Sequence, residues 1–418
     1  MNMYQYSRTA LRTNFPALTH RNFRIYWLGQ CVSLIGTWAQ SIGQTWLVLS
    51  LTGSPLLLGI LGSIQFLPIT CFSLFAGVII DRYPKKRIIL MTQFAAMILA
   101  FTLSALVFTH TVTYEHILIL ALILGFSNTI DMPSRQAFTI ELAGKQDLMN
   151  AIALNSATFN LARIIGPAIG ALLMAYFGAG WCFLLNGFSF MAVIVSLLKV
   201  KVTPYVRKKV SENNIFKEIK DGLKYIAHEP ALLQTILMVL IIGIFVFNFN
   251  ILIPVFTKSI LHQGEKTYGL LMSALGVGSL FGALMVSVKS KSGPNIKVLL
   301  KSSILISIMF ILISFTKSYY FTTILLVITG IFNIWFSTTA NSTLQITTKD
   351  EYRGRVMSVY SLVFAGATPI GNMFAGISAD MFGANIAFLL SGVLTIVLIA
   401  LLSLWFKLRR PSGEVVAK

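Results

Sequence analysis

The chain has 418 residues, of which 56% are hydrophobic and only 11% are charged, and its mean hydropathy is +0.78. A water-soluble fold of this length needs more charge to cover its surface, so the composition excludes one and indicates an all-α membrane protein. The formal net charge of +19 does not indicate nucleic acid, because the cations lie in short clusters between apolar runs and not on one soluble face or tail.

Twelve apolar runs are long enough, at roughly 20 residues each, to cross the hydrocarbon core of a bilayer as helices. The runs are continuous, whereas membrane strands would alternate in polarity over about ten residues. The twelve transmembrane helices are predicted near 22–50, 56–80, 88–109, 116–140, 148–177, 181–199, 231–257, 267–288, 298–315, 319–345, 355–380 and 384–406.

The distribution of Lys and Arg predicts the orientation of these helices. With both termini in the cytoplasm, 29 of the Lys and Arg residues fall on that side and three on the other, as the positive-inside rule requires. We therefore expect a multi-pass protein of a bacterial inner membrane with both termini cytoplasmic. Its expected parts are an N-terminal segment (1–21), a six-helix bundle (22–199), a cytoplasmic linker (200–230), a second six-helix bundle (231–406) and a cytoplasmic tail (407–418).

The linker contains an apolar pattern of its own. Ile215, Phe216, Ile219, Leu223 and Ile226 recur at helical spacing, with lysines on the other side. This pattern predicts an amphipathic helix on the inner leaflet. A solvated tether between the two bundles is the alternative.

The two bundles show an internal repeat. Residues 177–187 match residues 382–392 at seven of eleven positions, with an offset of 205. The same offset pairs Gly166 with Gly371 and Gly77 with Gly282. Two pseudo-symmetric six-helix halves predict a central cavity near the bilayer midplane.

A charged turn follows the second run, with the sequence Gly77-Val-Ile-Ile-Asp81-Arg82-Tyr-Pro-Lys85. It resembles the loop signature of the major facilitator superfamily. The resemblance implies a conformational gate, in which Asp81 braces the two halves and a cation of the turn pairs with an acid of the fourth helix. We expect Asp131 to be that acid, with Arg82 or Lys85 as its partner. The expected gating set is Gly77, Asp81, Arg82, Lys85, Asp131 and Arg135.

The fifth run contains Arg163-Ile-Ile-Gly166-Pro167-Ala-Ile-Gly170. Gly and Pro at this spacing allow a neighbouring helix to approach closely and introduce a bend. The run is similar to the antiporter signature found in the exporters of the superfamily. Arg163 lies deep in a span, where it could meet an anionic group of a substrate or form a structural ion pair with a carboxylate.

The resemblance also suggests which helices line the cavity, namely the first, fourth, seventh and tenth. Their polar and aromatic residues are suited to a molecule with ring and hydrogen-bonding groups. The cavity candidates are Trp38, Gln40, Gln44, Asn128, Asn248, Asn250, Asn333, Trp335 and Asn341. The candidates for proton coupling are Asp81, Asp131, Glu141 and Asp380.

The segments Phe23-Arg24-Ile-Tyr-Trp27 and Asn150-Ala-Ile-Ala-Leu-Asn155 resemble the exporter branch of the superfamily that includes the enterobactin exporter. This implies a secondary transporter that exports a siderophore-like or drug-like amphipathic molecule by alternating access in exchange for protons, acting as a monomer among membrane lipids. A lysophospholipid transporter of the same fold, or a receptor or scaffold that does not transport, is the alternative. The sequence contains no nucleotide-binding or catalytic motif, so neither an enzyme nor a cofactor or metal site is expected.

Overall fold

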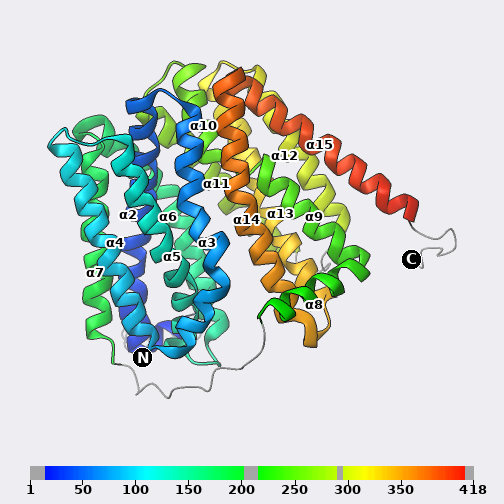
Figure 1. The fold of residues 1–418 in the computed structure, drawn as a ribbon, viewed down its shortest axis with the longest axis horizontal. Coiled ribbons are helices and arrows are strands. Elements are labelled where there is room, and N and C mark those ends of the chain that lie inside the picture. The colour runs from blue at the N-terminus through cyan, green and yellow to red at the C-terminus, as the bar shows by residue number, and fades with distance from the viewer. Residues whose placement is uncertain (1–14, 202–214, 290–294, 410–418) are drawn as a thin grey trace, which may run out of the picture. The chain divides into compact units, whose positions relative to one another are not determined.

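The computed structural model describes residues 15–201, 215–289 and 295–409, apart from a few side chains inside helices, that of Asp81 among them. All elements of the described part are helices (Figure 1). They are η1 (Pro16–Thr19), α2 (Arg21–Thr52), α3 (Pro55–Arg82), α4 (Lys85–Phe108), α5 (Tyr114–Ala143), α6 (Leu148–Phe177), α7 (Gly180–Lys199), α8 (Ile215–His228), α9 (Pro230–Phe245), α10 (Phe249–Ser259), α11 (Glu265–Lys289), α12 (Ile296–Phe315), α13 (Tyr319–Thr347), α14 (Asp350–Phe382) and α15 (Ala384–Arg409).

Eleven of the described helical segments are long and apolar enough to cross a membrane, with α9 and α10 together counting as one. The prediction of an all-α membrane protein is confirmed. The expected first span, 22–50, forms α2, which has the required length but is not among the eleven. Its polar side chains, Gln30, Gln40 and Gln44 among them, are buried against other helices.

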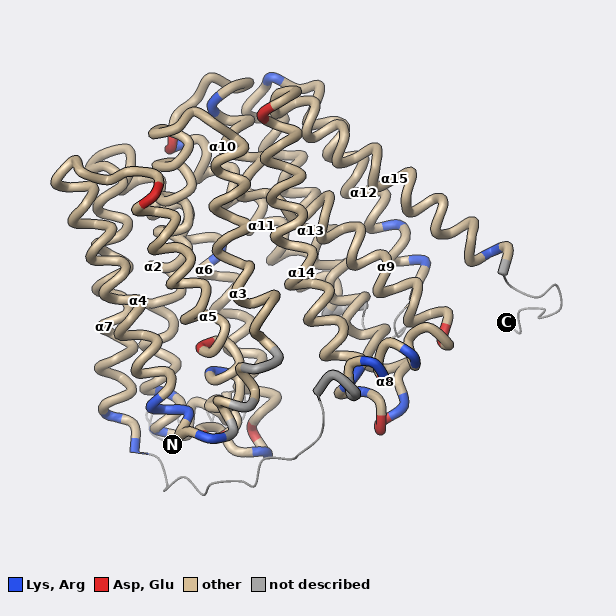
Figure 2. The backbone as a smooth tube through the Cα atoms, viewed as in Figure 1, with Lys and Arg blue, Asp and Glu red and all other residues tan. Residues whose placement is uncertain are grey.

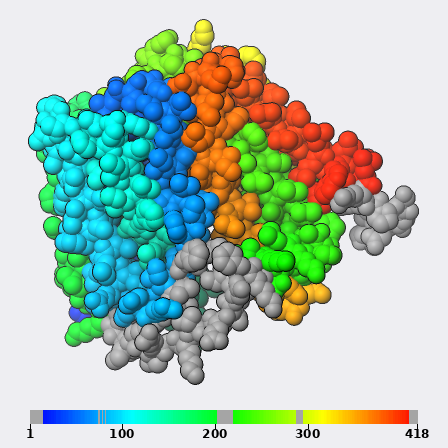
Figure 3. Space-filling model, in the orientation of Figure 1, coloured from blue at the N-terminus to red at the C-terminus, as the bar shows by residue number. Residues whose placement is uncertain are grey.

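The chain divides into two compact units. Unit 1 comprises residues 1–53, 64–212 and 263–276, and unit 2 comprises residues 54–63, 213–262 and 277–418. Ser54 and the first nine residues of α3 therefore cluster with unit 2, and the first half of α11 clusters with unit 1. On the visible face of unit 2, α14 lies beside α9 and meets α15 at one end (Figure 3).

The offset of 205 recurs in the helix boundaries. Thr113 accepts a hydrogen bond from the backbone N–H of His116 and caps α5, and Ser318, 205 residues later, caps α13 through the N–H of Phe321. The helices α6 and α14 end at Phe177 and Phe382, which are also 205 residues apart. Unit 1 and unit 2 therefore contain equivalent helices in the same register.

Glycines bring α2 and α7 into close contact in unit 1. Gly29, Gly36 and Gly43 recur every seven residues and lie on one face of α2. A Cβ atom at Gly36 would lie 2.8 Å from the Cβ atom of Ser189 on α7, and one at Gly43 would lie 2.9 Å from that of Cys182. Because small residues allow helices in a membrane to pack closely, this stripe determines the spacing of α2 and α7.

The expected span 231–257 is interrupted. The helix α9 ends at Phe245 and α10 begins at Phe249. The side-chain amide of Asn248 donates to the carbonyl oxygen of Ile244 at 2.6 Å, which replaces a backbone hydrogen bond lost at the break. Gly371 of α14 lies against the break, since a Cβ atom there would be 2.7 Å from the same carbonyl oxygen.

The amphipathic helix of the linker, α8, contacts other helices of unit 2, and its expected place on the inner leaflet stays a prediction. Within α8, Ile226 is buried against α9 and α14, while Leu223 remains exposed. Tyr225 stacks on Tyr352 of α14 with ring centroids 4.3 Å apart, and Asp221 lies 3.7 Å from Arg355. Part of the apolar face of α8 thus packs on unit 2; the side chains of Ile215 and Phe216 lie outside the described residues.

We predict that Gly36→Val lowers the melting temperature of the purified protein by about 3 °C or more, because the new side chain would overlap Ser189 and separate α2 from α7. Gly354→Val is the matched control, since a Cβ atom at Gly354 has no neighbour within 4 Å. Thermal unfolding followed by tryptophan fluorescence gives the melting temperature of each variant. Equal shifts for the two variants would contradict the role of the glycine stripe.

Candidate conformational switch and substrate site

A buried carboxylate connects α4 and α5 in unit 1. Asp131 on α5 is only 5% exposed. Its Oδ1 atom accepts hydrogen bonds from the Thr92 hydroxyl at 2.5 Å and from the Gln93 amide at 3.4 Å, and its Oδ2 atom accepts one from the Nε–H of Arg135. Arg135 lies one turn further along α5, where an i,i+4 pair meets on one helix face. We call Asp131, Arg135, Thr92 and Gln93 the Asp131 cluster.

Polar groups of α2 extend this cluster. Tyr26 is 3% exposed, packs its ring edge-on against Phe138, and faces Arg135, Asp131 and Gln30. The hydroxyl of Tyr26, the amide nitrogen of Gln30 and the amide oxygen of Gln93 are buried without a hydrogen bond of ordinary geometry among the described residues.

The pairing of the charged turn differs from the prediction. Lys85, at the first residue of α4, forms an ion pair with Glu141 at 3.0 Å, not with Asp131. The helices α4 and α5 are antiparallel neighbours, and Thr92, which contacts Asp131, lies two turns beyond Lys85. Asp131 is therefore too deep in the bundle for Lys85, whereas Glu141 lies ten residues nearer to the end of α5.

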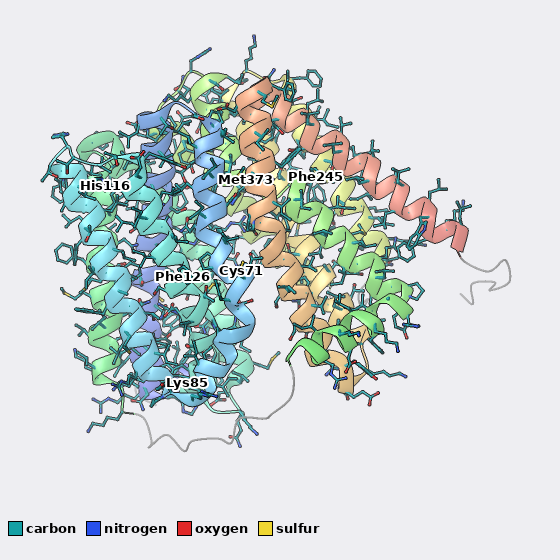
Figure 4. The ribbon with its side chains drawn as sticks, viewed as in Figure 1. Cys71, Lys85, His116, Phe126, Phe245 and Met373 are labelled. Carbon is teal, nitrogen blue, oxygen red and sulfur yellow. The ribbon has the colours of Figure 1, made fainter. Side chains whose placement is uncertain are left out.

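Lys85 and His116 lie at opposite ends of unit 1 (Figure 4), so α5 runs from the end with His116 to the end with Lys85. Lys and Arg gather mainly at helix ends (Figure 2). Arg82 is exposed at the last residue of α3, and a Cβ atom at Gly77 would have no neighbour within 4 Å. The side chain of Asp81 lies outside the described residues, so its expected bracing role stays a prediction.

The glycines of the fifth predicted run contact α2. A Cβ atom at Gly166 would overlap that of Trp38, and one at Gly170 would lie 2.8 Å from the carbonyl oxygen of Ala39. Gly371 makes the equivalent contact in unit 2, where its neighbour is Ile244, 205 residues after Ala39. The predicted close approach at Gly166 and Gly170 is therefore observed, and it recurs in unit 2.

Pro167 frees a backbone carbonyl of α6 at the point where α11 contacts this helix. Proline has no N–H, so the carbonyl of Arg163 lacks its partner within the helix. Gly276 of α11 packs on this carbonyl, since a Cβ atom there would lie 2.9 Å from its oxygen. The hydroxyl of Ser273, one turn earlier on α11, donates to the neighbouring carbonyl of Ile164 at 2.8 Å.

Several residues expected in a cavity are engaged inside one unit. The amide of Asn186 on α7 donates to Gln40 at 2.7 Å, both being buried. Trp38 packs edge-on against Phe159 of α6 with centroids 5.8 Å apart. Trp335 donates from its indole N–H to the carbonyl of Gly282 on α11 at 3.2 Å. These three side chains connect helices within their units, and their expected place in a cavity stays a prediction.

The expected amides also differ in their environment. Asn248 is 1% exposed at the break between α9 and α10, and Asn333 is buried beside Ser337. Asn341 accepts a hydrogen bond from Gln345 at 2.5 Å. Of the others, Gln44 is buried, Asn128 is half-buried and Asn250 is exposed.

Asp380 caps a helix from a distant part of the chain. It lies near the end of α14 and accepts hydrogen bonds from the Ser54 hydroxyl at 2.9 Å and from the backbone N–H of Leu56 at 3.3 Å. A carboxylate at a helix N-terminus satisfies an N–H that has no partner in the helix and interacts favourably with the dipole. Asp380 thus attaches the start of α3 to α14.

Sequence reasoning missed Thr92, Gln93, Tyr26 and Asn186. Each is a polar residue inside an apolar run, which is a signal in itself because a polar group in hydrocarbon needs a partner. The identity of that partner depends on the depth and rotation of the facing helix, which a single run does not encode.

The helix arrangement is that of known transporters. It superimposes on the crystal structure of the nucleoside transporter NupG with a TM-score of 0.71, covering 92% of this chain and 98% of that one at 14% sequence identity. At this identity the likeness shows the fold alone.

Comparison of sequences identifies the family. Residues 12–417 match the family of transmembrane secretion effectors, and the chain belongs to it. It is 28% identical to the staphyloferrin A transporter of Staphylococcus aureus, over 87% of this chain and 90% of that protein. It is 26% identical to the multidrug efflux pump Tap of Mycolicibacterium fortuitum, over 82% of this chain and 86% of that protein. The chain is therefore a small-molecule exporter of the major facilitator superfamily, and the resemblance read from the sequence is confirmed.

We predict that Asp380→Ala increases hydrogen–deuterium exchange in the first turn of α3 by roughly fivefold, because losing a cap costs about 1 kcal/mol. Asp350→Ala, which removes an exposed carboxylate at the other end of α14, is the control. Mass spectrometry of peptides covering residues 54–60 measures the exchange. Unchanged exchange in Asp380→Ala would show that the cap does not stabilise α3.

Proposed function

We propose that this exporter expels a siderophore-like or drug-like amphipathic molecule by alternating access, and that protons drive it through Asp131. The relatives named above support the substrate class, since they transport staphyloferrin A and multiple drugs. The membrane setting follows from the apolar helices, and we place both termini in the cytoplasm on the distribution of Lys and Arg.

One observation carries the assignment to Asp131. The positions equivalent to Asp131 and Arg135 in the repeat, 205 residues later, are Phe336 and Ala340. Both lie on α13 and are at most 1% exposed. In unit 2 an apolar pair therefore fills the place of the ion pair, so the helix packing does not require charge there. Because a buried ion pair is costly compared with well-packed apolar residues, its presence in unit 1 favours a functional role.

The chemistry of the Asp131 cluster suits a proton switch. Protonation of Asp131 would remove the negative charge that holds Arg135, and the Thr92 hydroxyl and the Gln93 amide can still bond the neutral acid. The freed guanidinium faces Tyr26 of α2, so the change reaches a third helix of unit 1. Near helix ends, Glu141 forms an ion pair with Lys85, and Asp380 accepts a hydrogen bond from Ser54 at the start of α3. These two carboxylates are therefore the weaker candidates for proton coupling.

The export itself is tested in a bacterial host that lacks its major efflux pumps. We expect cells expressing the chain to retain less ethidium or macrolide, or to release more iron-chelating activity into the medium, than cells with an empty vector. A protonophore should remove the difference. No difference for any of these compounds would contradict the substrate class, and a difference that survives the protonophore would contradict proton coupling.

We predict that Asp131→Asn lowers proton-driven transport into everted vesicles by about tenfold or more, because a charge-assisted hydrogen bond and the titrating group are both lost. Asp350→Asn is the control, since that carboxylate is exposed. The double variant Asp131→Asn with Arg135→Gln removes the unpaired guanidinium and so separates misfolding from loss of coupling. If the double variant is well folded and still pumps as the wild type does, Asp131 is not the coupling group.

A further inference from the structure

Arg163 occupies a position that a cation rarely takes. It is the sixteenth of the thirty residues of α6. At a rise of about 1.5 Å per residue it lies roughly 20 Å from either end of the helix, too far for its side chain to reach the membrane surface. A charge at this depth needs water, a counter-ion or a ligand.

Arg163 lies on the side of α6 between the contacts that this helix makes with α2 and with α11. Exposed residues lie on more than one side of α6: Phe159, on the side of Arg163, is 45% exposed, and Leu161 and Leu172 are 51% and 47% exposed. With about 100° of rotation per residue, Arg163 lies on the opposite side of the helix from both leucines. Its side is bordered by Gly166, which contacts α2, and by Ile164, which contacts α11. Arg163 itself is half-buried.

No carboxylate of the described residues neutralises Arg163. Its side chain makes no ion pair or hydrogen bond within that part of the chain. Three carboxylates of unit 1 are paired with other residues: Asp131 with Arg135, Glu141 with Lys85 and Asp147 with His20. The remaining described carboxylates of unit 1, Glu115 and Glu265, lie in the first turns of α5 and α11, far from the middle of α6. The repeat places an uncharged residue, Thr368, at the equivalent position of α14.

We propose that Arg163 is the binding site for a carboxylate of the exported molecule. This proposal rests on the proposed export function and assigns the substrate class as an amphipathic carboxylic acid. A guanidinium offers two parallel N–H donors that fit the two oxygens of a carboxylate, and it is less strongly hydrated than an ammonium. Phe159, one turn before Arg163 on the same side of α6, forms an aromatic pair with Trp38. The charge therefore has an aromatic neighbourhood that suits an acid attached to a ring or another apolar body.

Binding to the purified protein tests this proposal apart from transport. The probes are 2-naphthoate and its uncharged analogue 2-naphthamide, and protein melting as a function of probe concentration gives the affinity. We expect the wild type to bind naphthoate more tightly than naphthamide. In Arg163→Gln we expect naphthoate binding to weaken about tenfold or more, with naphthamide binding changed less than twofold. Arg163→Lys keeps the charge without the planar donor pair, so its affinity for naphthoate should lie between those of the wild type and of Arg163→Gln. Arg353→Gln, which alters an exposed cation of α14, is the matched control.

The melting temperature without probe separates a ligand site from a structural ion pair. If Arg163 has no partner in the protein without probe, Arg163→Gln should melt at or above the wild-type temperature, because an unpaired, half-buried charge has been removed. A fall of about 3 °C or more in Arg163→Gln but not in Arg353→Gln would indicate a structural pair and overturn the proposal. Equal affinity of the wild type for naphthoate and naphthamide would also overturn it. Neither result would affect protonophore-sensitive efflux of ethidium or macrolide, which tests the export function.

Discussion

A polar group on a membrane-spanning helix must find its partner inside the protein, because hydrocarbon offers neither a donor nor an acceptor. This constraint explains the main polar contacts of both units. Asp131 accepts hydrogen bonds from three donors on two helices. Gln40 accepts one from Asn186, and Asn248 donates to the carbonyl oxygen of Ile244 where α9 ends. Such contacts determine the depth and rotation of one helix against another, which apolar packing alone specifies less strongly.

The same constraint gives the glycines and prolines their importance. Lipid does not drive helices together, so close backbone approach has to supply the packing. Gly166 lies against Ala39 in unit 1, and Gly371 lies against Ile244 in unit 2. Proline adds a second effect, since Pro167 frees a carbonyl of α6 at the point where Gly276 of α11 meets it. Close contact and local weakening of a helix thus occur together on α6, which is a suitable property for a helix that must move against its neighbours.

Much of the fold could be predicted from the sequence, because length, hydropathy and repeat are properties of single segments. The helices that begin at Tyr114 and Tyr319 stand in the register that the offset of 205 predicts. The site was less predictable. Lys85 pairs with Glu141 and not with Asp131, and Gln40 faces α7, because both outcomes depend on how far antiparallel helices slide past one another. The break after Phe245 carries no strong signal either, since an apolar run reads the same whether its helix is continuous or interrupted.

The repeat allows the requirements of the fold to be separated from those of transport. Glycine contacts and helix caps occur in both units at equivalent positions, so they belong to the scaffold. Three charges inside the helices of unit 1 do not recur: Asp131, Arg135 and Arg163 correspond to Phe336, Ala340 and Thr368. A scaffold that folds with apolar or uncharged residues at these positions in one half has no structural need for charge in the other. This difference between the units is the reason for placing the proposed proton switch on α5 and the proposed carboxylate site on α6.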